Sequence, residues 1–141
     1  MREIDLAYVA GIIDGEGSIC ITKESKLHDR RATPKYFLSV SVGNSNEWLI
    51  YWLCNTFGGS FCFRGRLGFS NLDIWVWQIT QAGACQFLKL ILPYLRLKHP
   101  QAELAIDFQS HRGRRGKKRT LMEVQLDEIF RQKMGILNKG G

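Results

Sequence analysis

One acidic residue near the start of the chain stands where a metal ligand would be placed. Glu16 lies between Gly15 and Gly17, directly after an apolar segment. That segment is predicted to be a helix that begins at Leu6, is capped by Asp5 and ends at Gly15. Because the C-terminal end of a helix is negative, a carboxylate there is disfavoured unless a cation compensates it. Glu16 is therefore a candidate ligand for Mg²⁺, with a solvated carboxylate at a helix end as the plainer alternative.

The helix that delivers Glu16 carries a narrow stripe of small residues. At 100° per residue, one side of it holds Ala7, Ala10, Gly11 and Asp14, and bulky apolar residues occupy the rest. A helix that is apolar all round is buried, so the plainest interpretation is a core helix crossing a sheet. No other predicted helix has equally little bulk. The best complement is a second copy of the same helix across a two-fold axis, with Asp14 capping the paired helix ends.

Residues 9–17 resemble the signature nonapeptide of the LAGLIDADG homing endonucleases. Val and Ile replace Leu, Gly replaces Ala, and Glu replaces the final Asp while keeping the carboxylate. Family-like segments follow in order at 57–59, 77–80, 92–98 and 101–102. The signature occurs once, which is typical of the single-motif, homodimeric type.

The resemblance implies three catalytic residues. Each subunit would supply Glu16 to a shared metal site, Lys98 would lie near the attacked phosphate, and Asn44 would order water. The plainer alternatives are a solvated lysine and, for Asn44, a helix cap. The implied cofactor is Mg²⁺ or Mn²⁺, with Ca²⁺ binding without cleavage.

Composition limits the class of partner. The 141 residues fit one domain, 1–141, with a basic loop and helix at about 111–135. Twenty Lys and Arg against 13 Asp and Glu give a net charge of +7, which suits nucleic acid or an anionic membrane. No apolar run has membrane-spanning length, so we expect no membrane partner. The first residues lack a signal-peptide pattern, and the expected location is intracellular: bacterial cytoplasm, chloroplast or mitochondrion.

Hydrophobic periodicity predicts an α+β fold with an αββαββα core and additional C-terminal helices. Its four-stranded antiparallel sheet carries helices on one face. The expected strands are 18–23, 36–42, 60–66 and 73–80. The expected helices after the first are 47–57, 84–95, 101–109 and 121–134. The four cysteines lack metal-ligand spacing and are expected to be reduced.

The open face of the sheet is the predicted DNA-binding surface, because two-stranded ribbons fit the major groove. Its candidate residues are Thr22, Glu24, Lys26, Arg30, Arg31, Lys35, Ser39, Ser41, Arg64, Arg66, Asp73 and Trp75. Parity does not decide whether Trp77 belongs to the core or to this face. The candidate phosphate contacts of the basic loop are Arg114, Arg115, Lys117 and Lys118. A solvated face and a solvated loop are the alternatives.

Together these features favour a site-specific double-strand DNA endonuclease that acts as a homodimer on a long pseudo-palindromic site. An RNA maturase or a non-cleaving DNA-binding protein of the same fold is the first alternative. An unrelated basic α+β RNA-binding module is a remoter one. Glu16 and Lys98 favour the nuclease, because binding alone requires neither.

Overall fold

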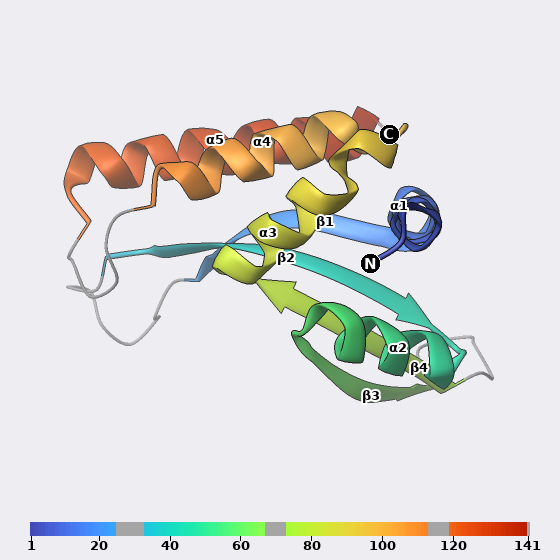
Figure 1. The fold of residues 1–141 in the computed structure, drawn as a ribbon. Helices are drawn as coiled ribbons and strands as arrows, with labels where there is room; N and C mark the ends of the chain where they lie inside the picture. The colour runs from blue at the N-terminus through green and yellow to red at the C-terminus, as the bar shows by residue number, and fades with distance from the viewer. Residues whose placement is uncertain (25–32, 67–72, 113–118, 141) are drawn as a thin grey trace.

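Four antiparallel strands form one sheet in the order β1-β2-β4-β3 (Figure 1). The computed structural model describes residues 1–24, 33–66, 73–112 and 119–140. The strands are β1 (Gly17–Glu24), β2 (Lys35–Asn44), β3 (Ser60–Arg66) and β4 (Asp73–Thr80). The predicted α+β class is confirmed, and so are the predicted bounds of β3 and β4.

Five α-helices and one short 3-10 helix accompany the sheet within the described residues. They are α1 (Glu3–Glu16), α2 (Glu47–Phe57), α3 (Gln81–Ile91), η1 (Leu92–Tyr94), α4 (His99–Ser110) and α5 (Leu121–Gly140). The order of elements gives the predicted αββαββα core, with α4 and α5 side by side over β1 (Figure 1). None of these helices is long and apolar enough to cross a membrane.

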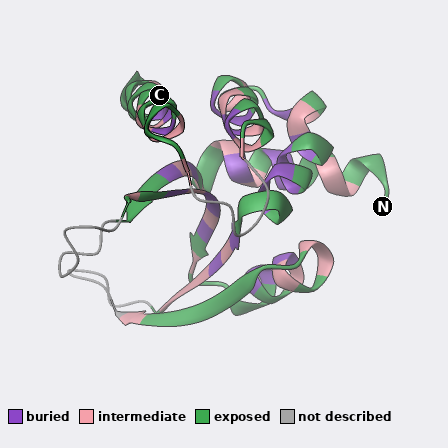
Figure 2. Cartoon of the chain, turned by 90° about the vertical axis from the view of Figure 1, so that its left-hand side faces the viewer, coloured by how far each residue is buried: buried purple, intermediate pink, exposed green. Residues whose placement is uncertain are grey.

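Contacts from three helices identify the covered face of the sheet. Trp77 of β4 packs on Phe87 of α3, with ring centroids 5.2 Å apart. Phe61 pairs with Trp77 across the strands and contacts Tyr51 of α2 at 6.0 Å. The third contact lies on β2, where the hydroxyl of Tyr36 donates to a carboxylate of α5. Buried residues accordingly gather between sheet and helices (Figure 2).

The opposite face of the sheet carries mainly polar and small residues on its first two strands. The pairs across β1 and β2 on this face are Ser18–Ser41, Cys20–Ser39, Thr22–Phe37 and Glu24–Lys35. Because side chains alternate along a strand, these residues point away from the helices. The predicted division into a covered and an open face is therefore confirmed for this ribbon.

Four of the five described α-helices depart from their predicted bounds: α3 spans Gln81–Ile91 instead of 84–95, α4 spans His99–Ser110 instead of 101–109, and α1 and α5 are longer than predicted. α1 begins at Glu3 with Arg2 as N-cap, so the prediction of Asp5 as the cap is wrong. It also continues past Gly15 to Glu16, and an added Cβ at Gly17 would lie 2.7 Å from the Ile13 Cα. The tight passage from α1 into β1 therefore requires glycine at this position.

The C-terminal helix shows the largest extension. α5 was predicted to end at Met134 but continues to Gly140. Asn138 donates to the Ile19 carbonyl of β1 at 3.0 Å, and Gln101 of α4 donates to the Leu137 carbonyl at 3.3 Å. These bonds hold the last turns of α5 beyond its predicted end.

Candidate functional site

The C-terminal end of α1 brings together two of the predicted catalytic residues. Asn44, at the end of β2, donates from Nδ2 to Glu16 Oε2 over 2.7 Å. Its Oδ1 accepts from the backbone N–H of Asn46 at 2.8 Å. The N-cap of α2 is Asn46, which accepts from Leu49 N, so Asn44 does not serve as a cap. Both ends of the Asn44 amide are thus fixed, and the orientation of the Glu16 carboxylate follows from them.

The third predicted residue, Lys98, is fixed to the same end of α1. Its backbone N–H donates to Asp14 Oδ1 at 2.9 Å, and its ammonium Nζ donates to the Asp14 carbonyl oxygen at 2.9 Å. The backbone N–H of Arg96 donates to Asp14 Oδ2 at 2.8 Å. Burial alone raises the pKa of Asp14, but the backbone donors at 96–98 outweigh it and lower that pKa below 3.8. Asp14 therefore holds the 95–98 segment against α1.

Lys98 also supplies the positive charge that the end of α1 lacks. The last turn of this helix contains no basic residue of its own. An ammonium bonded to one of its last carbonyls offsets the negative end of the helix dipole. Glu16 is exposed, only two residues beyond Asp14 on the same turn, and its Oε1 forms no hydrogen bond to the described residues. The carboxylate of Glu16, the amide of Asn44 and the ammonium of Lys98 are thus all held at the last turn of α1.

The donor set of one chain fits part of a magnesium site. Among the described residues, no group of three or more His, Cys, Asp or Glu side chains could hold a metal ion. Mg²⁺ keeps several waters and is commonly bound through one or two carboxylates. The exposed oxygen of Glu16 therefore fits as one ligand, and water molecules or a carboxylate of a second molecule would complete the coordination.

The small-residue stripe on α1 divides between the interior and the surface. Ala10 has no exposed area and packs in the core, and the Asp14 carboxylate bonds to the backbone of its own chain. The prediction that these two residues belong to the stripe facing a second helix is therefore corrected. Ala7 and Gly11 are exposed. An added Cβ at Gly11 or Gly15 would meet no atom within 4 Å. The surface stripe is therefore made by Ala7, Gly11 and Gly15.

Most predicted DNA-contacting residues of the first ribbon lie on the open face. Thr22, Glu24 and Lys35 are exposed, and Ser41 is half-buried. Ser39 is recessed, with 7% of its surface exposed. Lys26, Arg30 and Arg31 lie outside the described residues.

The second hairpin departs from the prediction. Trp75 pairs with Asn44 and Phe63 and has the parity of buried Trp77, so it lies on the covered face. The assignment of Trp75 to the open face is therefore wrong, because side chains alternate along β4. Asp73 has the same parity but is exposed at the start of the strand. Trp77 is a core residue whose Nε1 donates to the Gly58 carbonyl at 2.8 Å.

The two arginines of this hairpin are only partly placed. Arg64 is exposed, at the register shift between Phe63 and Gly65. The backbone of Arg66 pairs with that of Asp73. The side chain of Arg66 lies outside the described part.

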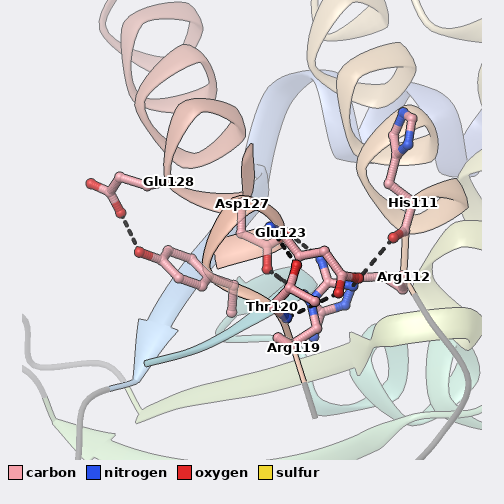
Figure 3. Close-up of polar contacts among 8 residues, drawn as sticks. His111, Arg112, Arg119, Thr120, Glu123, Asp127 and Glu128 are labelled. Carbon is pink, nitrogen blue, oxygen red and sulfur yellow. Dashed lines mark hydrogen bonds and ion pairs between the residues drawn. The ribbon is translucent and has the colours of Figure 1, made fainter. Parts of the chain in front are cut away.

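The ends of the predicted basic loop are anchored by one buried acid (Figure 3). Asp127 of α5 is 2% exposed and accepts from Arg112 Nη1 at 3.1 Å and from Arg119 Nη2 at 2.8 Å. Thr120 and Glu123 exchange backbone–side-chain hydrogen bonds, which is the capping box of α5. Arg112 and Arg119 are consequently neutralised by the protein. The loop residues predicted to contact phosphate, Arg114, Arg115, Lys117 and Lys118, lie outside the described residues.

Replacing Asp127 by Ala is expected to lower the free energy of unfolding by about 3–5 kcal/mol, because two largely buried guanidinium groups lose their shared carboxylate. Asp107→Ala is the matched control, since this aspartate is 60% exposed and pairs only with His111 at the surface. Its expected cost is about 0–1 kcal/mol. Urea denaturation of both variants measures the difference. Equal, small losses would contradict the anchoring role of Asp127.

The sequence predicted a basic loop at this place, but the anchoring role of Asp127 was not predicted from it. Asp127 belongs to no motif, and next to Glu128 in an amphipathic helix it resembles an ordinary surface acid. A signal was present in the helical period, which places Asp127 on the same face as Phe130 and Met134.

Comparisons with known proteins agree on the fold. No protein-family model matches the sequence, and no curated protein matches it. One match is a solved structure of the homing endonuclease I-CvuI in complex with the I-CreI target, in the presence of 2 mM Mg and with the DNA not cleaved. Its TM-score is 0.78 and its sequence identity 20%, over 96% of this chain and 82% of that chain. The archaeal intron-encoded homing endonuclease I-Vdi141I, complexed with DNA, matches with a TM-score of 0.57 and 12% identity over 96% and 99% of the two chains.

A third structure carries the family name. The LAGLIDADG homing endonuclease I-GzeII, in complex with its DNA target, matches with a TM-score of 0.52 and 18% identity over 74% of this chain and 35% of that chain. The chain therefore has the fold of the LAGLIDADG homing endonucleases.

Proposed function

We propose that this chain is a LAGLIDADG homing endonuclease of the single-motif type, which cuts double-stranded DNA as a homodimer with a divalent metal ion. The observation that carries the proposal is the cluster of Glu16, Asn44 and Lys98 at the end of α1. The three residues come from positions far apart in sequence, and hydrogen bonds join Asn44 to Glu16 and Lys98 to Asp14 on the last turn of α1, which supports the roles that the family resemblance implies. A protein that only binds nucleic acid has no need of an oriented carboxylate beside an ammonium.

The exposed face of α1 supports the homodimer. Ile4 is 69% exposed and Tyr8 is 54% exposed, on the same side as Gly11 and Gly15. Large apolar side chains beside a strip of glycine are typical of a helix that packs closely on another helix. A two-fold axis along this strip would bring two Glu16 carboxylates together, which would supply a second acidic ligand to the same ion.

Aromatic rings continue this apolar surface from α1 onto α2. Tyr8 meets Trp52 edge to face at 6.0 Å, and Trp48 stacks on Trp52 at 6.1 Å while 64% exposed. Exposed aromatic surface of this kind is enriched at protein interfaces. It therefore adds to the area that a second subunit would cover.

The roles of the residues follow from their contacts. When bound, a divalent ion activates a water molecule and stabilises the leaving oxygen of the phosphodiester. Glu16 would hold the ion through the carboxylate oxygen that Asn44 leaves unbonded. Asn44 keeps that carboxylate in one orientation, and Lys98 places positive charge where the attacked phosphate develops negative charge. Asp14 fixes the backbone that carries Lys98.

The open sheet face and the basic loop account for DNA binding. The β1–β2 ribbon presents polar side chains that fit the major groove, and Arg114, Arg115, Lys117 and Lys118 would contact phosphates without reading sequence. Because site symmetry mirrors protein symmetry, the target would be pseudo-palindromic.

A binding selection tests this assignment. The protein is offered duplex DNA with randomised inverted-repeat half-sites together with structured RNA, in EDTA. The expected result is retention of DNA with an enriched pseudo-palindrome. Preferential retention of RNA would contradict the proposal and favour a maturase.

A salt titration tests the basic loop separately. Replacing Arg114 and Arg115 by Gln is expected to flatten the slope of log K against log salt by about 0.9 for each lost phosphate contact, without changing base preference. The matched control replaces Lys89 and Lys133, exposed lysines on the helix side, by Gln. If both double variants keep the wild-type slope, the loop does not contact phosphate.

A further inference from the structure

One row of polar residues crosses all four strands on the open face. The register pairs Ser18 of β1 with Ser41 of β2, Ser41 with Gln78 of β4, and Gln78 with Ser60 of β3. Their shared parity is opposite to that of buried Trp77, so all four side chains point away from the helices. The row therefore lies across the middle of the surface assigned to DNA.

Gln78 is the one long side chain in this row. It is half-buried, yet its amide forms no hydrogen bond or ion pair within the part of the chain that the structure describes. Serines stand on both sides of it, so no neighbouring bulk restricts its reach. No side-chain nitrogen or oxygen of the described residues is buried without a partner, so the Gln78 amide reaches solvent, and its donor and acceptor are available to a ligand.

The side chains in the two neighbouring rows lack the hydrogen-bonding groups that Gln78 carries. The row closer to Glu16 contains Gly43, Val76 and Cys62. The row on its other side contains Cys20, Ser39 and Thr80. None of these side chains carries an amide or a guanidinium group. Gln78 is thus the group in this central region with two adjacent hydrogen-bonding functions that can pair with one base edge.

We propose that Gln78 is a specificity-determining residue that reads adenine in the major groove; the inference rests on the proposed DNA-binding function. A glutamine amide pairs with adenine bidentately, accepting from N6 and donating to N7. Gln78 is level with Ser18, two residues beyond Glu16 on β1, so the adenine lies in the inner part of each half-site. The two-fold symmetry places one such adenine in each half.

The test is a binding selection on palindromic duplexes whose half-sites, about ten base pairs or one helical turn long, are fully randomised. EDTA is present, so the readout does not depend on cleavage. The wild-type protein is expected to enrich adenine about ten- to a hundred-fold at one symmetric inner position. Gln78→Leu is expected to lose that enrichment and keep every other preference. Gln78→Arg is expected to change the preference at the same position to guanine.

The matched control is Gln125→Leu, which removes an exposed amide from α5 on the helix side of the molecule. It should keep the wild-type sequence profile. An unchanged profile in both Gln78 variants, with correct folding shown by circular dichroism, overturns the role of Gln78 and leaves the proposed function standing. A wild-type protein that enriches no sequence overturns both.

Discussion

Replacing Glu16 by Gln is expected to abolish DNA cleavage while the fold and DNA binding persist. The Glu16 side chain is exposed and bonded only to Asn44, so removal of its charge leaves the core untouched. Gln still accepts from the Asn44 amide but is a poor ligand for Mg²⁺. A bound metal ion supplies several kcal/mol of transition-state stabilisation, and about 1.4 kcal/mol is a factor of ten in rate. The cleavage rate should therefore fall at least about a thousand-fold.

A second exposed acid provides the control for this experiment. Glu103 of α4 pairs with His99 at the surface, and its carboxylate is 59% exposed. Glu103→Gln removes the same charge far from the end of α1 and should cleave at the wild-type rate. Single-turnover cleavage in Mg²⁺ and binding in EDTA measure the two effects separately. Undiminished cleavage by Glu16→Gln would contradict the assignment of Glu16 as the metal ligand.

Replacing Gly11 by Leu is expected to convert a dimer into a folded, inactive monomer. Within the chain an added Cβ at Gly11 meets nothing within 4 Å, so the leucine has room and the subunit keeps its fold. Leucine also favours the helix over glycine by up to about 1 kcal/mol. Between two α1 helices the leucine would force the backbones apart, at about 1–3 kcal/mol for each copy. Sedimentation should show loss of the dimer, and cleavage should fall with it.

Gly135 offers a matched position for that substitution. It is an exposed helical glycine on α5 whose added Cβ likewise meets no atom within 4 Å. Gly135→Leu should keep both the dimer and the cleavage activity. If Gly11→Leu sediments and cleaves as Gly135→Leu does, α1 is not the subunit interface.

The sequence predicts where the strands begin and end better than it predicts which face of each strand is covered. The bounds of β3 and β4 were predictable because glycine pairs and polar turns flank alternating runs. The covered face of β4 was not, because Trp75 and Trp77 are amphipathic aromatics that suit either face. Only the register with β2, in which Trp77 pairs with Val42, shows which tryptophans lie under the helices.

Contacts between distant segments were the part that periodicity could not provide. Nothing local indicates that Asn138 bonds to β1, and for that reason α5 was predicted too short. Asp14 was assigned to a helix pair because its position on the stripe is all that the sequence reveals. Its bonds to the 96–98 backbone depend on how the chain returns to α1 after α3. Gln78 was overlooked because it is one polar residue in a mostly apolar strand.

The most direct measurement of the central claim is cleavage of a plasmid library of randomised pseudo-palindromic targets by the purified wild-type chain, with Mg²⁺ or with EDTA. The broken plasmids are captured and their ends sequenced. We expect double-strand breaks at the centre of one enriched pseudo-palindrome, with Mg²⁺ only. Retention of an enriched pseudo-palindrome without breaks at any Mg²⁺ concentration would contradict the nuclease and identify a DNA-binding protein of the same fold.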